Sequence, residues 1–356
     1  MLEIKDLVKK YPGGRTAVSH FSLNIREGEI IAVLGGKGAG KTSLLKTLAG
    51  AEEKTSGKVL LNGKPLVLND VIMVFDDLAL INNRTLKYNL ERSLRLRGMA
   101  PAEMSERILA ATDYLGLTPR LLDKTKSLTL VEKKKAALAR LTIREDYNVV
   151  LVDDITAGLP EKGSEEVWEL AMTVLLNLGK TVIYATENPR EAVSISDKVV
   201  ILENGGIKQA GHFSEIAENP ACLASARALD RRYNTLPAKL IKVEGLALEI
   251  GKNKLRLDVS HLEPALASEE FIGKEVLVGF SAADTVQFEG GIQLDVIYVE
   301  RTAEGSYLKC LHPSGPITLF EKSFGIFPRT FAFLPRADKV LLFDAVTENS
   351  ILNFRI

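Results

Sequence analysis

The sequence predicts an α/β domain built on a parallel sheet, followed by an all-β, barrel-like domain. Apolar strand patterns alternate with helical periodicity over residues 1–236, and a helical subdomain is expected at about residues 85–147. Short strands separated by glycine turns occupy residues 237–356. With 356 residues, 46% of them hydrophobic, the chain is long enough for two or three domains with sizeable cores.

Composition argues against several classes of function. The 46 basic and 46 acidic residues balance, so the whole chain carries no basic field that favours nucleic acid or anionic lipid. Cys222 and Cys310 fit neither a metal-site nor a disulfide spacing, which favours buried, reduced thiols. No apolar run reaches the roughly 18 residues of a membrane span, and the N-terminus lacks the apolar region of a signal peptide. Any membrane role is therefore expected to come through partner proteins.

The N-terminal segment predicts two strands around a turn. Residues 2–8 alternate apolar and polar side chains as an edge strand does, and residues 17–25 alternate in the same way. Tyr11 lies in the glycine- and proline-containing turn between them. Its ring either stacks on an adenine base or packs within the loop. Residues 58–64 then predict a short strand and a hairpin.

The strongest motif is a glycine-rich loop, G-x-x-x-x-G-K-T, at residues 35–42. It follows an apolar run and opens a helical pattern, which argues against a chance lysine in a turn. In such a loop, backbone N–H groups surround a polyphosphate, Lys41 adds charge beside the β and γ oxygens, and Thr42 offers a hydroxyl to Mg²⁺. We therefore predict an ATP·Mg²⁺ site that includes Gly36, Lys37, Gly38, Ala39, Gly40, Lys41, Thr42 and Ser43.

Two apolar runs end in paired carboxylates. Residues 71–75 precede Asp76 and Asp77, and residues 148–152 precede Asp153 and Asp154. A buried parallel strand that ends in aspartate places its carboxylate beside the Mg²⁺ shell of a phosphate-loop site. The alternative for Asp153 is a helix cap. Two more strands, at residues 181–186 and 198–202, enclose a short helix and complete a parallel sheet with covered faces.

The pattern weakens around residues 211–236, where a helix and then a linker through Asn234–Pro237 are expected. From residue 238 onward, short strands with glycine turns and no long helix predict a small β-barrel. These strands are expected at residues 240–243, 246–250, 254–257, 276–280 and 293–297.

Over nearly its whole length, the chain resembles the ATP-binding subunits of ABC transporters, in the carbohydrate-importer branch of the maltose and glycerol-phosphate type. Tyr11 stands at the position of that family's adenine-stacking tyrosine. The other matching segments are Leu138–Arg140 after the signature, the Walker B strand Val149–Asp153, the hairpin Glu203–Gly211, and the barrel segments Gly279–Asp284 and Leu341–Asp344.

The resemblance implies a phosphate-loop ABC ATPase at residues 1–236 and a regulatory, OB-like (TOBE-like) β-barrel at residues 237–356. It implies ATP and Mg²⁺ as cofactors, a second ABC ATPase subunit and two transmembrane permease subunits as partners, and an extracytoplasmic substrate-binding protein as an indirect partner. It places the chain peripherally at the cytoplasmic face of the inner membrane. Nucleic acid is not expected as a partner, because no basic stripe interleaved with aromatic residues appears.

The signature motif departs from the family pattern. In the family, each ATP lies between the phosphate loop of one subunit and the L-S-G-G-Q signature of the other. Here the signature residues that would face the partner's ATP are Thr129, Leu130, Val131 and Glu132. Leu130 and Val131 replace two glycines that allow close backbone approach to a phosphate. Branched side chains there are expected to hold the phosphate away or to distort the loop.

Three further catalytic-cycle positions differ. Asp154 stands where the family has the glutamate that orients the attacking water, so the carboxylate is one methylene shorter. Glu187 replaces the switch histidine, and an ionised carboxylate cannot donate a hydrogen bond to the γ-phosphate. Asp76 replaces the glutamine that contacts Mg²⁺, and its carboxylate is expected to contact the ion through water. Residues 157–160, in the loop after the Walker B strand, also depart from the family pattern.

These departures leave the phosphate loop and Asp153 intact. The sequence therefore predicts retained nucleotide binding, with intrinsic hydrolysis weak or absent without a partner. The partner is expected to be a non-identical, catalytic ATPase subunit. The transported substrate is expected to be a carbohydrate or polyol, with glycerol the first choice. The alternative is a nucleotide-binding regulator or scaffold that transports nothing.

Overall fold

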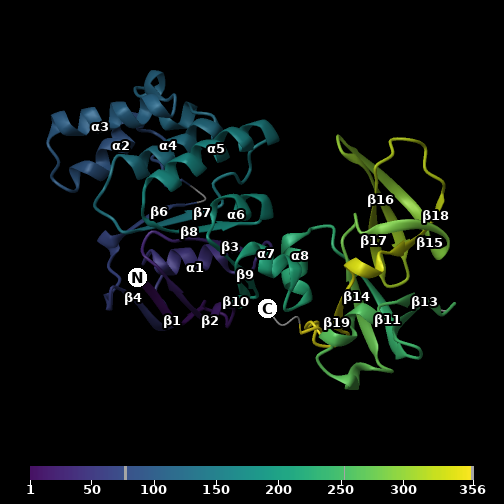
Figure 1. The fold of residues 1–356 in the computed structure, drawn as a ribbon. Coiled ribbons are helices and arrows are strands. Elements are labelled where there is room, and N and C mark those ends of the chain that lie inside the picture. Colours follow the sequence, from purple (N-terminus) through teal and green to yellow (C-terminus); the bar gives the residue numbers. More distant parts are fainter. Residues whose placement is uncertain (76–77, 252, 354–356) are drawn as a thin grey trace. The chain divides into compact units, whose positions relative to one another are not determined.

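The computed structural model describes residues 1–75, 78–251 and 253–353. Its contacts divide the chain into two compact units, Met1–Phe213 and Ser214–Ile356, and each is described by itself (Figure 1). The expected domain boundary at residues 236 and 237 stays a prediction. Residues 213–229 carry two short helices, α7 (Phe213–Glu218) and α8 (Leu223–Leu229).

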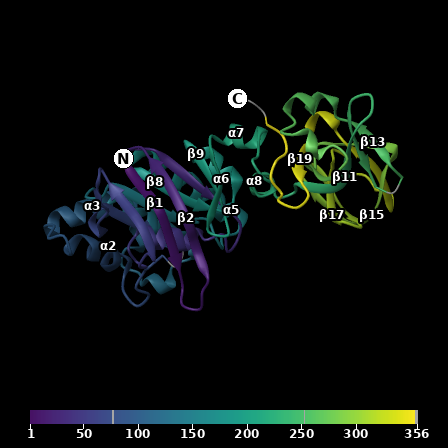
Figure 2. The same cartoon turned by 90° about the horizontal axis from the view of Figure 1, so that it is seen from below.

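The first unit opens with an antiparallel sheet in the order β2-β1-β4-β5. Its strands are β1 (Leu2–Lys10), β2 (Thr16–Ile25), β4 (Ser56–Leu61) and β5 (Lys64–Pro65). Leu2 pairs with Ile25 of β2 and with Leu61 of β4, so the edge position expected for residues 2–8 is wrong. The alternating pattern reports one buried face and does not report how many neighbours a strand has. Figure 2 shows β1 and β2 side by side.

The central sheet has the order β10-β9-β3-β8-β7-β6. Strands β3, β6, β7, β8 and β9 run parallel, and β10 pairs antiparallel with β9. The strands are β3 (Ile30–Leu34), β6 (Val71–Val74), β7 (Val149–Asp153), β8 (Thr181–Thr186), β9 (Lys198–Glu203) and β10 (Gly206–Gly211). The predicted parallel sheet is confirmed.

Both faces of this sheet are covered, as strand β7 illustrates. Val150 and Val152 belong to a core that includes residues of α2, α3, α4 and α5. Val149 and Leu151 point the other way, into a core shared with α1 and β1. Figure 1 shows α1 on one side of the sheet and α4 and α5 on the other. The helices are α1 (Lys41–Leu48), α2 (Leu86–Arg95), α3 (Pro101–Tyr114), α4 (Leu130–Thr142), α5 (Glu161–Asn177) and α6 (Pro189–Ile195).

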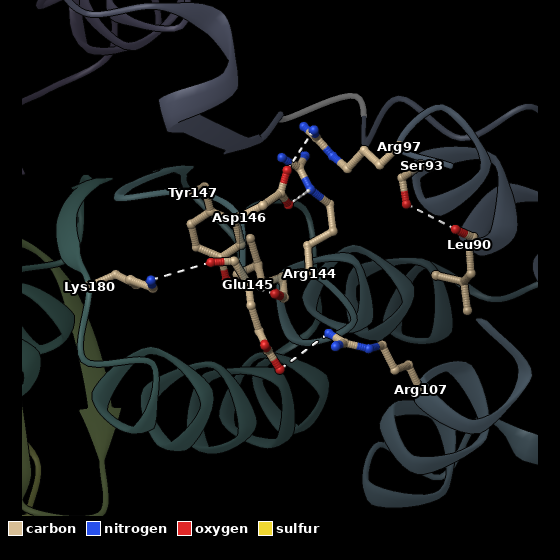
Figure 3. A network of polar contacts seen from close by, with 10 residues as sticks. Leu90, Ser93, Arg97, Arg107, Arg144, Glu145, Asp146, Tyr147 and Lys180 are labelled. Atoms are coloured by element: carbon tan, nitrogen blue, oxygen red, sulfur yellow. Dashed lines mark hydrogen bonds and ion pairs between the residues drawn. The ribbon is translucent and has the colours of Figure 1, made fainter. Parts of the chain in front are cut away.

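A polar network joins α3 and the segment just after α2 to the turn between α4 and β7 (Figure 3). An Arg97 guanidinium nitrogen lies 2.6 Å from an Asp146 carboxylate oxygen, and one of Arg107 lies 3.2 Å from a Glu145 carboxylate oxygen. Lys180, just before β8, donates to the Glu145 carbonyl at 3.4 Å. Charge pairs therefore attach α3 and the segment after α2 to the turn before β7, in addition to the apolar core.

The second unit is built from two antiparallel sheets, in the orders β13-β12-β11-β14-β19 and β17-β16-β15-β18. One apolar core takes residues from both sheets, such as Phe280 and Phe333, whose ring centroids are 6.1 Å apart. The strands are β11 (Asn234–Lys242), β12 (Leu246–Ile250), β13 (Leu255–Asp258), β14 (Glu275–Phe280), β15 (Thr285–Thr302), β16 (Gly305–His312), β17 (Gly315–Glu321), β18 (Thr330–Pro335) and β19 (Leu341–Asp344).

The linker expected at Asn234–Pro237 is wrong, because β11 begins at Asn234. Pro237 pairs with Leu277 of β14, whereas pairing with β12 begins only at Ala238. The strand therefore has one neighbour at Pro237, and a residue without an N–H is tolerated at such a local edge. Within residues 1–75, 78–251 and 253–353, no helix has the length and apolar character required to cross a membrane.

Candidate nucleotide-binding site

The glycine loop connects the buried strand β3 to the first turn of α1. Gly40, the residue before α1, has a φ of 106°, and a Cβ there would lie 2.2 Å from the Ala17 carbonyl oxygen, so only glycine fits. At Gly36 and Gly38, by contrast, a Cβ would meet nothing within 4 Å. The open space beside this loop and the N–H groups of the first turn of α1 fit the phosphate chain of ATP.

Lys41 lies at the base of this loop with 7% of its surface exposed. Its Nζ donates to the carbonyl oxygens of Gly35 at 2.7 Å and Gly36 at 3.0 Å. The same Nζ lies 3.4 Å from Oε1 of Glu187, which follows strand β8. Strand β8 pairs directly with β3, so its end stands next to the loop. The structure thus brings the residue at the switch position against the loop lysine.

The oxygen donors expected around Mg²⁺ come from α1 and β7. Thr42 stands in the first turn of α1, and Asp153 is the last residue of β7 with 2% exposure. Hydroxyl and carboxylate oxygens are the donors that Mg²⁺ prefers, so these residues would hold the ion, which would neutralise charge on the phosphates. Asp76, expected to act through water, lies outside the described residues.

Asp154 stands in a strained turn directly after β7. Its φ is 42°, its N–H donates to the Ala185 carbonyl at 2.9 Å, and its own carbonyl accepts from Lys134 Nζ at 3.3 Å. Burial, and then the charge of Glu191, raise the pKa of the Asp154 carboxyl to about 6, although Lys41 acts in the opposite direction. The turn therefore holds its carboxyl group in a partly buried, anionic environment.

A buried carboxylate on α6 organises this environment. Glu191 is 3% exposed and accepts four hydrogen bonds from neutral donors. Thr156 and Asn188 donate to Oε1 at 2.7 and 3.2 Å, while Tyr184 and Thr186 donate to Oε2 at 2.7 and 2.8 Å. Burial and the Glu191 charge raise the pKa of Tyr184. Sequence reasoning missed Glu191, because its donors come from separate segments of the chain.

Tyr11 lies beside the start of α1. Its hydroxyl donates to Glu52 Oε2 at 2.5 Å and lies 3.1 Å from Ser43 Oγ. The ammonium group of Lys9 lies 4.8 Å from the ring centroid. Burial, and then the hydrogen bond to Glu52, raise the pKa of Tyr11. The ring is thus held near the phosphate loop, and adenine stacking stays a prediction.

The signature residues form the first turn of α4, which begins three residues before the helix expected at residues 133–141. Thr129 caps the helix, and its Oγ1 accepts from the Glu132 N–H at 3.2 Å. The Glu132 carboxylate in return accepts from the Thr129 N–H at 2.8 Å. The start of α4 is therefore closed by its own side chains and carries a carboxylate.

Leu130 and Val131 fit against glycines of their own chain. A Cβ on Gly163 of α5 would lie 2.9 Å from Val131 Cγ2, and one on Gly158 would lie 3.6 Å from Leu130 Cδ2. Leu130 nevertheless keeps 42% of its surface exposed. The two branched side chains are thus accommodated by the loop after Asp154 and by α5.

Comparison with known proteins supports this assignment. Residues 18–157 match a family described as ABC transporter. The spermidine/putrescine import ATP-binding protein PotA of Aggregatibacter actinomycetemcomitans is 30% identical over 291 residues, which cover 78% of this chain and 77% of PotA. The sn-glycerol-3-phosphate import ATP-binding protein UgpC of Psychromonas ingrahamii is 30% identical over 269 residues, which cover 74% of this chain and 71% of UgpC.

A solved structure supports the fold. The protein cbiO1 of Clostridium perfringens, described as part of the ABC transporter complex cbiONQ, matches with a TM-score of 0.54 and 25% identity. The match covers 61% of this chain and 90% of cbiO1. Together with the glycine loop and the carboxylates at the ends of β7 and β8, these matches show that the chain belongs to the ABC transporter family, as an ATP-binding subunit of the importer type.

Proposed function

We propose that this subunit binds ATP·Mg²⁺ competently, hydrolyses it poorly, and works beside a non-identical ATPase subunit. The observation that carries the proposal is the contrast between two neighbouring elements. The glycine loop is complete, whereas Glu187 Oε1 lies 3.4 Å from Lys41 Nζ, where the family places a histidine. A carboxylate there can neither donate to a terminal phosphate nor stabilise its negative charge.

The position of Asp154 supports weak hydrolysis. Its side chain is one methylene shorter than the family's glutamate, and its backbone is held in the left-handed region. Positioning contributes most of the catalysis in phosphoryl transfer, so a water-orienting carboxylate that reaches less far is expected to act slowly. Asp154 and Glu187 are therefore assigned as impaired members of the catalytic set.

The start of α4 supports an unlike partner. Thr129, Leu130, Val131 and Glu132 would face the partner's nucleotide, and Leu130 and Val131 stand there in place of two glycines that allow close backbone approach to a phosphate. Loss of one transition-state contact typically costs ~10²–10³ in rate. In a dimer of two copies of this chain, each of the two ATP sites would combine an impaired signature with the impaired water-orienting carboxylate of Asp154. An unlike partner with an intact signature would instead face this chain's intact loop.

A repair experiment tests the proposal. The chain is co-expressed with its partner subunit, and the partner's own catalytic glutamate is replaced so that only the site with this chain's loop can turn over. The double substitution Asp154→Glu with Glu187→His should then raise ATP turnover by at least tenfold. Glu166→Gln, on α5, is the matched control and should change nothing. A repaired complex that stays inactive contradicts the proposal.

For the transported substrate, we infer a carbohydrate or polyol, with glycerol as the first to test. The similarity to UgpC, named for sn-glycerol-3-phosphate import, supports a polyol-type substrate. The equal identity to PotA, named for spermidine and putrescine import, makes polyamines the second candidate. Uptake of labelled glycerol and spermidine by cells that lack this subunit distinguishes the two. Loss of neither uptake would contradict both assignments.

We further propose that two transmembrane permeases hold the subunit at the cytoplasmic face of the inner membrane and that the second unit is a regulatory, OB-like barrel. The two sheets around one core support a barrel-like domain, and the regulatory role rests on the resemblance to the importer family. The competing function is a nucleotide-binding regulator or scaffold without transport. Co-purification with a pair of permeases supports transport, whereas a complex that contains only cytoplasmic proteins would favour the competing function.

A further inference from the structure

We propose that Glu187 makes the nucleotide site discriminate against the third phosphate, so that the isolated chain binds ADP at least as tightly as ATP. The inference rests on the proposed nucleotide site and adds a specificity-determining residue to it. Lys41 of α1 and Glu187 after β8 form an ion pair, with Nζ and Oε1 3.4 Å apart.

The pair neutralises the main cation of the loop. The Lys41 side chain is 8% exposed and the Glu187 side chain is 38% exposed, so water screens their attraction only in part. Lys41 also donates to the carbonyl oxygens of Gly35 and Gly36, which keep its ammonium group at the base of the loop. A phosphate that approaches Lys41 therefore meets a charge that is already shared with Glu187.

The position of Glu187 affects the terminal phosphate most. The loop amides and the first turn of α1 surround the inner phosphates of a bound nucleotide, while the loop lysine reaches the outer ones. Glu187 directly follows β8, the strand next to the loop strand β3, and Asp154 directly follows β7, the neighbour of β8. A terminal phosphate that reaches Lys41 would therefore lie nearer to Glu187 than the inner phosphates would.

The carboxylates of Asp154, Glu187 and Glu191 interact electrostatically, and burial limits the screening of their charges by water. Glu187, Glu191 and Lys41 all act electrostatically on Asp154. Glu191 is fully enclosed by its four donors, so its charge stays in place. The cations Lys41 and Lys134 act on Asp154 in the opposite direction, and Lys134 Nζ donates to the Asp154 carbonyl oxygen at 3.3 Å. A γ-phosphate would add negative charge to a group that already has excess negative charge.

The experiment measures equilibrium binding of Mg·ADP and of the Mg²⁺ complex of a non-hydrolysable ATP analogue to the full-length purified chain. For the natural sequence, ADP should bind at least as tightly as the analogue. Glu187→Gln keeps the size of the side chain and removes its charge, so it should tighten analogue binding about three- to tenfold and change ADP binding less than twofold. Glu187→His should act in the same direction.

Glu166→Gln is the matched control, because it also removes a carboxylate that is paired with a lysine. Glu166 Oε1 of α5 lies 2.6 Å from Lys135 Nζ of α4. It should change neither affinity. The inference is overturned if the natural chain prefers the ATP analogue, or if Glu187→Gln shifts both nucleotides equally or neither. Absence of binding for both nucleotides would overturn the nucleotide site itself, which distinguishes the two failures.

Discussion

The starts of α1 and α4 are two helix N-termini that the family uses to contact ATP, and they are built in opposite ways. Helix α1 follows Gly40, which provides no side-chain cap, so its first amides are left for a ligand. Helix α4 follows Thr129, whose hydroxyl and the Glu132 carboxylate close a capping box. One helix start is thus open to an anion, whereas the other is satisfied by its own side chains, and its Glu132 carboxylate is paired with Arg120 at 3.0 Å. The difference fits the proposal that this chain keeps nucleotide binding while its contribution to a partner's site is impaired.

The largest expected effect concerns the open helix start. Gly40→Ala forces a Cβ against the Ala17 carbonyl at 2.2 Å in a left-handed conformation, and we expect a loss of about 3 kcal/mol in unfolding free energy together with loss of nucleotide binding. Gly38→Ala is the matched control, because its φ is 82° but nothing lies within 4 Å, so about 1 kcal/mol is expected.

Urea unfolding followed by the fluorescence of Trp168, the single tryptophan of the chain, measures both variants. Trp168 lies on α5, with its ring centroid 5.3 Å from that of Tyr184, and so reports on the first unit. Equal losses for the two variants would show that the close approach at Gly40 is unimportant.

The next effect concerns the packing of the closed helix start. Gly163→Ala should cost about 1 kcal/mol, because the new Cβ would stand 2.9 Å from Val131 Cγ2. In a Val131→Gly background, the same change should stabilise the chain by about 0.5 kcal/mol through its higher helix propensity. The double-mutant cycle should therefore give a coupling of about 1–2 kcal/mol. A coupling near zero would mean that Val131 does not use the space at Gly163.

The smallest effect concerns the cap itself. Thr129→Ala removes the hydroxyl that accepts from the Glu132 N–H at 3.2 Å, and a loss of about 0.5 kcal/mol in unfolding free energy is expected. Thr129→Ser keeps the hydroxyl and should lose much less. If alanine and serine behaved alike in the same urea assay, the capping box would not stabilise α4.

Much of the fold was readable because its signals are local. The glycine loop carries its own strand and helix context, and strand β8 has the predicted bounds of residues 181–186 because it is one continuous buried run. By contrast, the place of β1 between two strands depends on pairing with residues far along the chain. Strand β15 was recognised only in part, at residues 293–297, because most of its side chains are not buried and its alternation is weak.

The site divides in the same way. The phosphate loop and Asp153 follow from motif and strand pattern, whereas the pair of Lys41 and Glu187 joins residues 146 positions apart. The enclosure of Glu191 likewise depends on hydroxyls from β8 and from the loop after β7. No periodicity in the sequence encodes such contacts, so they required the tertiary structure.

The most direct test of the central claim measures nucleotide affinity and steady-state ATP turnover on the same preparation of the isolated full-length chain with Mg²⁺. The account predicts that the natural chain binds nucleotide saturably and that Lys41→Ala abolishes this binding. The ATP turnover of the natural chain should be no faster than that of Lys41→Ala. Turnover that is rapid in the natural chain and lost in Lys41→Ala would contradict the account, because the chain would then catalyse hydrolysis without an unlike partner.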